Sequence, residues 1–175
     1  ILSNADPGEP GAGQSLGTLT VDAGVPLAFV TLTDGHASYA FYDENPAGRM
    51  LSQDDLPALP GDVSALFFGG ISLVVEPCAA AYEALMTREA RARVTMIDPN
   101  IRPGFIRDEA AYRARIGRML KLADIIKLSD EDLAWIDERK SIEAHVADLL
   151  AQPKCDLVVV TLGEGGSRAF TASTE

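Results

Sequence analysis

The sequence predicts an α/β fold: a doubly wound, mostly parallel sheet flanked by helices, together with a small β-hairpin. Between residues 65 and 161, apolar runs of strand length alternate four times with segments of helical period. This alternation is typical of right-handed βαβ units and a parallel sheet. Upstream of it, two runs rich in β-branched and aromatic residues flank Asp34-Gly35, a dipeptide favoured in tight hairpin turns.

Composition narrows the choice of partners. The 175 residues carry 15 Lys+Arg against 26 Asp+Glu, a formal net charge of −11. This balance argues against nucleic acids and anionic membranes, whose binding depends on clustered Lys and Arg. No apolar run approaches the roughly 20 residues of a membrane-spanning helix. Cys78 and Cys155 lie outside any C-x-x-C motif, which predicts buried, reduced thiols and a cytoplasmic protein.

The N-terminal part divides into a loop and a hairpin. Residues 1–26 are rich in Gly and Pro and have no periodicity, so they are predicted to be loop. The hairpin strands are expected at 27–33 and 37–42. Both hairpin faces are fairly apolar by alternation, so the hairpin is expected to cover a pocket, pack on a second subunit, or both.

Residues 43–175 are predicted to form the α/β core. After a polar, turn-rich stretch at 43–64, the expected strands are 65–70, 93–97, 124–128, 157–161 and 167–171. The expected helices are 76–90, 108–122, 130–137 and 141–151. The strand at 157–161 is continuously apolar, which suits a sheet buried on both faces.

The segments that follow the strands are where chemistry is expected, because parallel sheets bind ligands at the carboxyl ends of their strands. These segments are 69–70, 98–102, 129–132 and 161–166. In the first long one, Pro99 and Pro103 flank Arg102, whose planar guanidinium suits a carboxylate, a phosphate or a diol. A surface arginine paired with an acid fits this pattern equally well.

The other two segments also leave alternatives open. Ser129 is placed to cap the helix at 130–137, and the acids that follow either offset the helix dipole or hold Mg²⁺ through water. The glycines of 163–166 permit close approach of a phosphate or an adenine, although a plain turn between strands would use them too. His36 and His145 form no pair and are expected to be solvated or structural.

Taken in order, five motifs carry a resemblance to a known family: LAFVTLTDGHASYAFY, LFFGGISL, MIDPNIRP, ADIIKLSDEDL and VVVTLGEGGS. They resemble the ribokinase-like (PfkB) carbohydrate kinases, within them the fructokinase and 2-keto-3-deoxygluconate kinase branch, over about residues 25–170. The resemblance implies that the hairpin at 27–42 is a β-lid. It also implies transfer of the γ-phosphoryl group of ATP to a sugar hydroxyl, with Mg²⁺ as cofactor.

The resemblance also implies roles for individual residues. The implied substrate-binding residues are Tyr39, Phe41, Gly70, Asn100 and Arg102. The implied nucleotide-binding residues are Lys127, Ser129, Thr161, Gly163 and Gly166. Asp132 is expected to contact Mg²⁺ through water. Ser129 and Asp132 stand where the family has Asn and Glu, and the shorter Asp would still permit a contact through water.

Two parts of the family pattern are not found. Residues 1–24 lack the strand with the sugar-binding Asp, so 1–26 are expected to be loop or the remnant of a missing N-terminal part. The GAGD element with the catalytic Asp base is expected beyond Glu175, so no catalytic residue is assigned in this chain. The alternatives are a nucleoside kinase of the same fold and a non-catalytic module that binds a sugar or nucleotide. A homodimer through the hairpin is a further expectation.

Overall fold

A computed structural model of the chain describes residues 27–33, 36–42 and 49–172, with side chains from residue 49 onward. The chain divides into two compact units, 1–47 and 48–175. In the first unit, β1 (Leu27–Thr33) and β2 (His36–Tyr42) pair antiparallel, from Leu27 opposite Tyr42 to Thr33 opposite His36. These strands form the predicted hairpin. The predicted loop at 1–26 and the turn at 34–35 lie outside the described residues.

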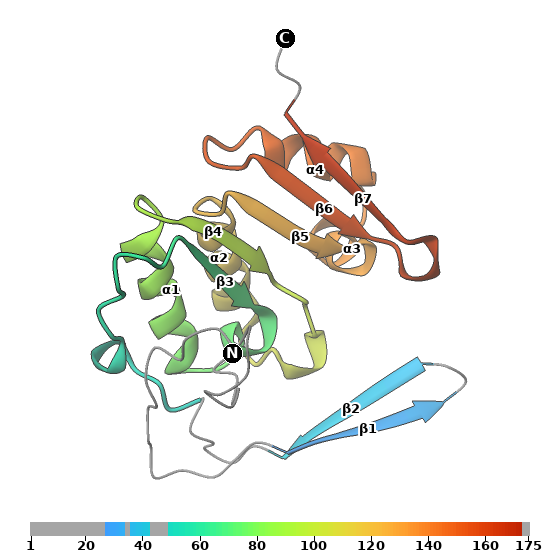
Figure 1. Cartoon of the computed structure of the whole chain (residues 1–175). Coiled ribbons are helices and arrows are strands. Elements are labelled where there is room, and N and C mark those ends of the chain that lie inside the picture. The colour runs from blue at the N-terminus through green and yellow to red at the C-terminus, as the bar shows by residue number, and fades with distance from the viewer. Residues whose placement is uncertain (1–26, 34–35, 43–48, 173–175) are drawn as a thin grey trace, which may run out of the picture. The chain divides into compact units, whose positions relative to one another are not determined.

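The second unit is a five-stranded sheet with helices (Figure 1). Its strands are β3 (Ala65–Gly69), β4 (Val94–Asp98), β5 (Ile125–Ser129), β6 (Leu157–Thr161) and β7 (Ser167–Thr171). Its helices are α1 (Cys78–Glu89), α2 (Glu109–Leu120), α3 (Asp130–Asp137) and α4 (Ile142–Leu150). The strand order is β3-β4-β5-β6-β7, with the first four parallel and β7 antiparallel at the edge. The predicted fold class is confirmed.

Of the four α-helices in the part of the chain that the structure describes, three begin at a side-chain cap. The side chains of Asp108, Ser129 and Ser141 each accept the backbone N–H of the residue three positions on, at the starts of α2, α3 and α4. These caps satisfy donors that have no partner within the helix. Because Ser129 is also the last residue of β5, the chain passes from strand to helix with no loop between them.

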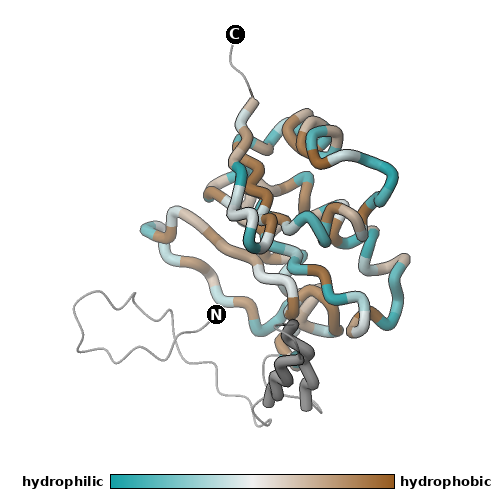
Figure 2. Tube along the Cα trace, turned by 90° about the vertical axis from the view of Figure 1, so that its right-hand side faces the viewer, coloured by the Kyte–Doolittle hydropathy of each residue, from teal (hydrophilic) through white to brown (hydrophobic). Residues whose placement is uncertain are grey.

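One face of the sheet is buried under the helices. The buried side chains on this face are Phe68, Ile97, Ile126, Leu128, Val158 and Val160. Since the strand order follows the chain and parallel crossovers are right-handed, the helices are carried to one side of the sheet (Figure 1). Burying one such side chain stabilises a fold by roughly 1.5–3 kcal/mol. Figure 2 shows hydrophobic stretches alternating with hydrophilic ones along the trace.

The opposite face of the sheet is partly open among the described residues. Phe67 and Val94 on this face are 54% and 46% exposed, and Val159 is half-buried while its neighbour Val158 is fully buried. The continuous apolar pattern of β6 predicts burial on both faces, but helices of the described residues cover only one. None of the helices that the structure describes is long and apolar enough to cross a bilayer.

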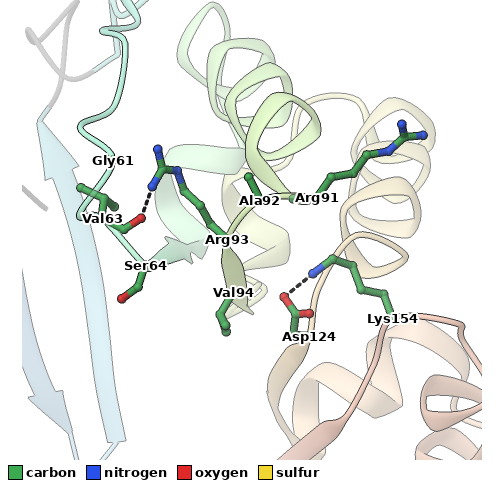
Figure 3. A pocket seen from close by; sticks show the side chains of 10 residues that line it. Gly61, Val63, Ser64, Arg91, Ala92, Arg93, Val94, Asp124 and Lys154 are labelled. Atoms are coloured by element: carbon green, nitrogen blue, oxygen red, sulfur yellow. Dashed lines mark hydrogen bonds and ion pairs between the residues drawn. The ribbon is translucent and has the colours of Figure 1, made fainter.

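At the amino ends of the strands, Asp124 connects β4, β5 and β6 through hydrogen bonds. Its Oδ2 accepts hydrogen bonds from the backbone N–H (2.6 Å) and the hydroxyl (3.0 Å) of Thr95 on β4, and from the ammonium of Lys154 (Figure 3). Its carbonyl accepts the N–H of Asp156, just before β6, at 2.9 Å. Burial acts to raise the pKa of Asp124, but the bonds from Lys154 and Thr95 and the charge of Lys154 outweigh it and lower the pKa.

Replacing Lys154 by Met should destabilise the fold in a pH-dependent way. We expect a loss of roughly 1.5–3 kcal/mol at neutral pH, the usual contribution of a hydrogen bond to a charged group. Because the pKa of Asp124 is lowered on folding, the stabilisation is present above the unfolded pKa of about 4 and disappears as the pH falls through the folded pKa. Urea unfolding at neutral pH and near pH 3 should therefore give a large and a small difference from wild type.

The matched control is Lys140→Met. Lys140 and Asp148 form an ion pair at the surface, with side chains 43% and 62% exposed. Because solvent screens such a pair, Lys140→Met should leave the unfolding midpoint near that of wild type at both pH values. Equal losses from Lys154→Met at both pH values would contradict the assignment.

Candidate active site

The carboxyl ends of β3, β4, β5 and β6 meet at one edge of the sheet, because these strands are parallel neighbours. All four segments predicted from the sequence to carry chemistry follow these strands directly. They fall into two groups. The ends of β3 and β4 carry Gly70, Asn100 and Arg102, and the ends of β5 and β6 carry Ser129, Thr161, Gly163 and Gly166.

The loop after β4 packs tightly against the end of β3. A Cβ atom on Gly70 would lie 1.8 Å from the carbonyl oxygen of Pro99 and 2.6 Å from its carbonyl carbon. Only glycine allows this approach. Asn100 then adopts a φ of 42°, in the left-handed region, which Asn tolerates better than most residues. The side chain of Asn100 is exposed, so the loop presents it at the edge.

Arg102 has no acidic partner among the described residues. Its Nη1 donates to the carbonyl of Ile101 at 3.0 Å, and its side chain is half-buried. Of the two interpretations that the sequence left open, the arginine paired with a nearby acid is therefore absent from the described part of the chain. The remaining N–H groups of the guanidinium are suited to an anionic or hydroxyl-bearing ligand.

The backbone ladder between β4 and β5 ends before it reaches this edge. It pairs Met96 with Ile125 and Ile97 with Ile126, whereas the β5–β6 ladder continues as far as Ser129 opposite Thr161. The site is thus divided between two pairs of strands, and side chains connect them where the ladder has stopped.

The first side-chain connection is an ion pair. Lys127 Nζ lies 3.0 Å from Oδ2 of Asp98, with side chains 25% and 19% exposed. Lys127 was expected on the nucleotide side, and in this structure its charge is matched by Asp98. The other oxygen of Asp98, Oδ1, is buried and has no hydrogen-bond partner in the described structure, so one carboxylate oxygen remains without a hydrogen bond.

The second connection is made by Asp132, the third residue of α3. Its Oδ2 accepts the N–H of Ser129 at 2.8 Å, and its own N–H donates to Oγ of Ser129 at 3.0 Å, which forms a capping box. Its Oδ1 accepts the N–H of Ile101 at 2.7 Å. Asp132 therefore holds the loop after β4 to the start of α3, although 31 residues separate it from Ile101.

Among the residues predicted to bind nucleotide, Ser129 and Thr161 are direct neighbours across the β5–β6 ladder. The turn that follows is closed by a bond from the N–H of Leu162 to the carbonyl of Gly166 at 2.8 Å. Gly163 and Gly166 have φ of 54° and 82°, a conformation that L side chains rarely adopt. A Cβ at either glycine would meet no atom within 4 Å, so backbone conformation is what requires them here.

The described residues do not fit a magnesium site held by the protein. They contain no group of three or more His, Cys, Asp or Glu side chains that could hold a metal ion. Asp132 is 2% exposed, and each of its oxygens already accepts a backbone N–H. The water-mediated contact of Asp132 with Mg²⁺ stays a prediction that this geometry does not favour.

A hollow of about 600 Å³ lies away from this edge, at the amino ends of the strands (Figure 3). It is lined by Gly61, Val63, Ser64, residues 90–94, Asp124 and Lys154. Lys154 is paired with Asp124, and Arg93 pairs with Glu89 at 2.8 Å and donates to the carbonyl of Val63. None of the residues predicted to bind substrate or nucleotide lines it, so we assign it no role in the site.

Other residues singled out from the sequence are structural or fall outside the description. His145 is 5% exposed and its Nε2 lies 2.9 Å from the carbonyl of Asp137. Cys78 and Cys155 are buried free thiols, as predicted, and burial raises the pKa of Cys78 to about 11. The side chains of Tyr39 and Phe41, expected on the lid, lie outside the described residues.

The sequence motifs did not reveal the bridging contacts of Asp98 and Asp132. Asp98 directly follows a predicted strand, and Asp132 lies in the first turn of a helix that Ser129 is predicted to cap. Their partners are distant in sequence, and no local pattern specifies them.

Comparison with known proteins agrees with the family predicted from the motifs. The pattern of the pfkB family carbohydrate kinases matches residues 20–175. A fructokinase from Rhizobium leguminosarum bv. trifolii is 50% identical over 145 residues, which cover 83% of this chain and 44% of that protein. The chain thus spans less than half the length of this curated relative.

Solved structures are similar as well. The structure of fructokinase with bound ATP from Xylella fastidiosa is 27% identical, has a TM-score of 0.73, and is matched over 89% of this chain and 49% of that one. The fructokinase from Vibrio cholerae O395 in its fructose, ADP and calcium ion bound form is 26% identical with a TM-score of 0.69, over 84% of this chain and 48% of that one.

Replacing Gly70 by Ala should destabilise the protein by about 1–3 kcal/mol, the usual cost of forcing extra atoms into a packed site. The added methyl group would meet backbone atoms of Pro99, which cannot rotate away as a side chain could. Chemical denaturation measures the loss. Gly104→Ala is the matched control in the same loop, because its Cβ would meet nothing within 4 Å; equal losses in the two variants would contradict the close approach.

Proposed function

We propose that the complete protein is an ATP-dependent sugar kinase of the fructokinase type, since this chain belongs to the pfkB family of carbohydrate kinases. The observation that carries the proposal is the 50% identity with a fructokinase over 145 residues. Structural relatives hold ATP in one case and fructose with ADP in another. By the same reasoning, the phosphoryl donor is ATP and the acceptor is a hydroxyl group of fructose or a related sugar.

The two groups of residues at the carboxyl ends of the strands are proposed to bind different substrates. Asn100 and Arg102, on the loop after β4, hold the sugar through its hydroxyl groups. Ser129 at the start of α3 and the turn from Thr161 to Gly166 approach the nucleotide. Support comes from Arg102, which has no acidic partner in the described part of the chain, and from the exposed side chain of Asn100.

The proposed role of these residues is to hold the two substrates in the geometry that phosphoryl transfer requires. Phosphoryl transfer needs the acceptor oxygen in line with the γ-phosphate and positive charge or N–H donors near the transferred oxygens. Arg102 supplies fixed N–H donors and a positive charge, and Asn100 supplies an amide for hydroxyl groups. The general base that accepts the hydroxyl proton is expected from the resemblance to be an Asp beyond Glu175, so no residue described in the structure takes this role.

Several finer points belong to the same proposal. The family resemblance implies Mg²⁺, but no step is assigned to it because the described residues do not fit a protein-held ion. The hairpin of β1 and β2 is proposed to serve as a lid over the sugar and as a dimer clasp, which sedimentation of the complete protein would test. The two buried free thiols are consistent with the predicted cytoplasmic location.

The experiment is ADP release by the protein from the complete reading frame, with ATP and Mg²⁺, across ketoses, aldoses, sugar acids and nucleosides. We expect stimulation by fructose above all others. A nucleoside as the best acceptor would support the alternative kinase of the same fold. Binding of a sugar without ADP release would support the non-catalytic module, and no response to any acceptor would overturn the kinase proposal.

Replacing Arg102 by Met should lower kcat/KM for the sugar about 10-fold or more, since a hydrogen bond to a charged group contributes roughly 1.5–3 kcal/mol. The KM for ATP should change little. Arg107→Met, an exposed arginine five residues further along, is the control and should behave as wild type. An unchanged kcat/KM in Arg102→Met would remove Arg102 from the sugar side.

A further inference from the structure

We propose that Asp132 is a positioning residue that fixes the sugar-side loop relative to the nucleotide-side helix, and that it is not a ligand of the metal ion. The kinetic part of this proposal rests on the proposed function, whereas its structural part does not. The sequence alone left Asp132 between helix-dipole compensation and a contact with Mg²⁺. The contacts of its carboxylate point to a third role.

The first argument is that each oxygen of the buried carboxylate accepts a backbone N–H group of the protein. Oδ1 accepts from Ile101 at 2.7 Å and Oδ2 accepts from Ser129 at 2.8 Å. Asp132 is 2% exposed, and Ile101 is 5% exposed. A buried charge is tolerated when hydrogen bonds replace water, and here two backbone N–H groups and the start of α3 do so. A magnesium-bound water needs an oxygen that solvent can reach, and Asp132 offers none.

The second argument is where the bond to Ile101 lies. The β4–β5 ladder stops at Ile97 opposite Ile126, so no backbone pairing continues to the loop that carries Asn100 and Arg102. Oδ1 of Asp132 supplies a connection beyond this point, and Lys127 with Asp98 supplies another. Ile101 lies between the two proposed sugar-side residues, Asn100 and Arg102. One hydrogen bond to its N–H therefore restrains both of its neighbours in the chain.

The third argument is that the loop is held from two sides. On one side, Pro99 is pressed against Gly70 so closely that a Cβ would overlap its carbonyl oxygen. On the other, Ile101 is bonded to Asp132. Asn100 lies between them with a φ of 42°, a strained conformation that persists only when its surroundings determine it. Removing Asp132 would free one of the two sides and let Asn100 and Arg102 move.

The test compares Asp132→Ala, and the milder Asp132→Asn, with two controls in the complete protein. Glu131→Gln removes an exposed acid from the same helical turn. Ser141→Ala removes the N-cap side chain at the start of α4, so it reports the effect of a lost helix cap away from the loop after β4. Asn can keep only one of the two bonds, because its amide nitrogen would face an N–H group. This variant serves if the Ala variant fails to fold.

Amide hydrogen exchange is the readout that needs no activity. Exchange of the Ile101 N–H should accelerate about 10-fold or more in the Asp132 variants, the change expected for losing a charge-assisted hydrogen bond. Exchange of Val158 in β6 should stay at the wild-type rate. Both controls should leave Ile101 protected. Unchanged protection of Ile101 in both Asp132 variants would overturn the proposal, whether or not the protein proves to be a kinase.

Kinetics then separate positioning from metal binding. Positioning predicts a KM for the sugar about 10-fold higher or more, with the KM for ATP and the Mg²⁺ concentration for half-maximal rate within about twofold of wild type. Both controls should keep the wild-type KM for the sugar. A raised Mg²⁺ requirement with an unchanged sugar KM would overturn the proposal and restore the metal contact. Faster exchange at Ile101 with no kinetic change would overturn the positioning role.

Discussion

The parallel alignment of four neighbouring strands is the constraint on which the rest of this chain depends. Their alternate side chains, such as Ile126 and Val158, are buried under the helices, and this burial holds the strands in one register. Parallel alignment sends every strand end to the same edge. Residues as distant in sequence as Gly70 and Gly166 therefore lie at the same end of the sheet. Burial of one face of the sheet therefore both forms the core and brings the candidate site residues to one end of the strands.

The two edges of the sheet are held by different means. At the amino edge, Asp124 connects β4, β5 and β6 through Thr95, Lys154 and the backbone of Asp156. At the carboxyl ends of the strands the β4–β5 ladder has already ended, and the buried carboxylate of Asp132 and the half-buried carboxylate of Asp98 take its place. A backbone ladder would fill this edge with its own hydrogen bonds. Side-chain connections hold the strands together and leave the loops above them free to present functional groups.

Much of this could be predicted from sequence, because strands and helices leave periodic patterns within a few residues. The bounds of α3, β6 and β7 agree with the predicted ones, and the predicted parallel sheet brings the four candidate segments to one end of the strands. What could not be predicted depends on distant partners. The bond from Ile101 to Asp132 and the approach of Pro99 to Gly70 exist only once the sheet has formed. The partial exposure of the sheet face that carries Phe67 also could not be predicted, because a hydrophobic pattern does not specify which elements cover a face.

Asp132 and Arg102 illustrate how burial distinguishes a structural role from a ligand-binding role when the sequence pattern fits both. Both lie just after strands, and both are charged residues in motifs of the same family pattern. Asp132 is buried with both oxygens engaged, so its charge serves the fold. Arg102 is half-buried with one bond to a neighbouring carbonyl, so most of its donors remain for a ligand. The bond that Asp132 accepts comes from Ile101, the residue next to Arg102, and this adjacency is the reason for proposing that the buried charge positions the half-buried one.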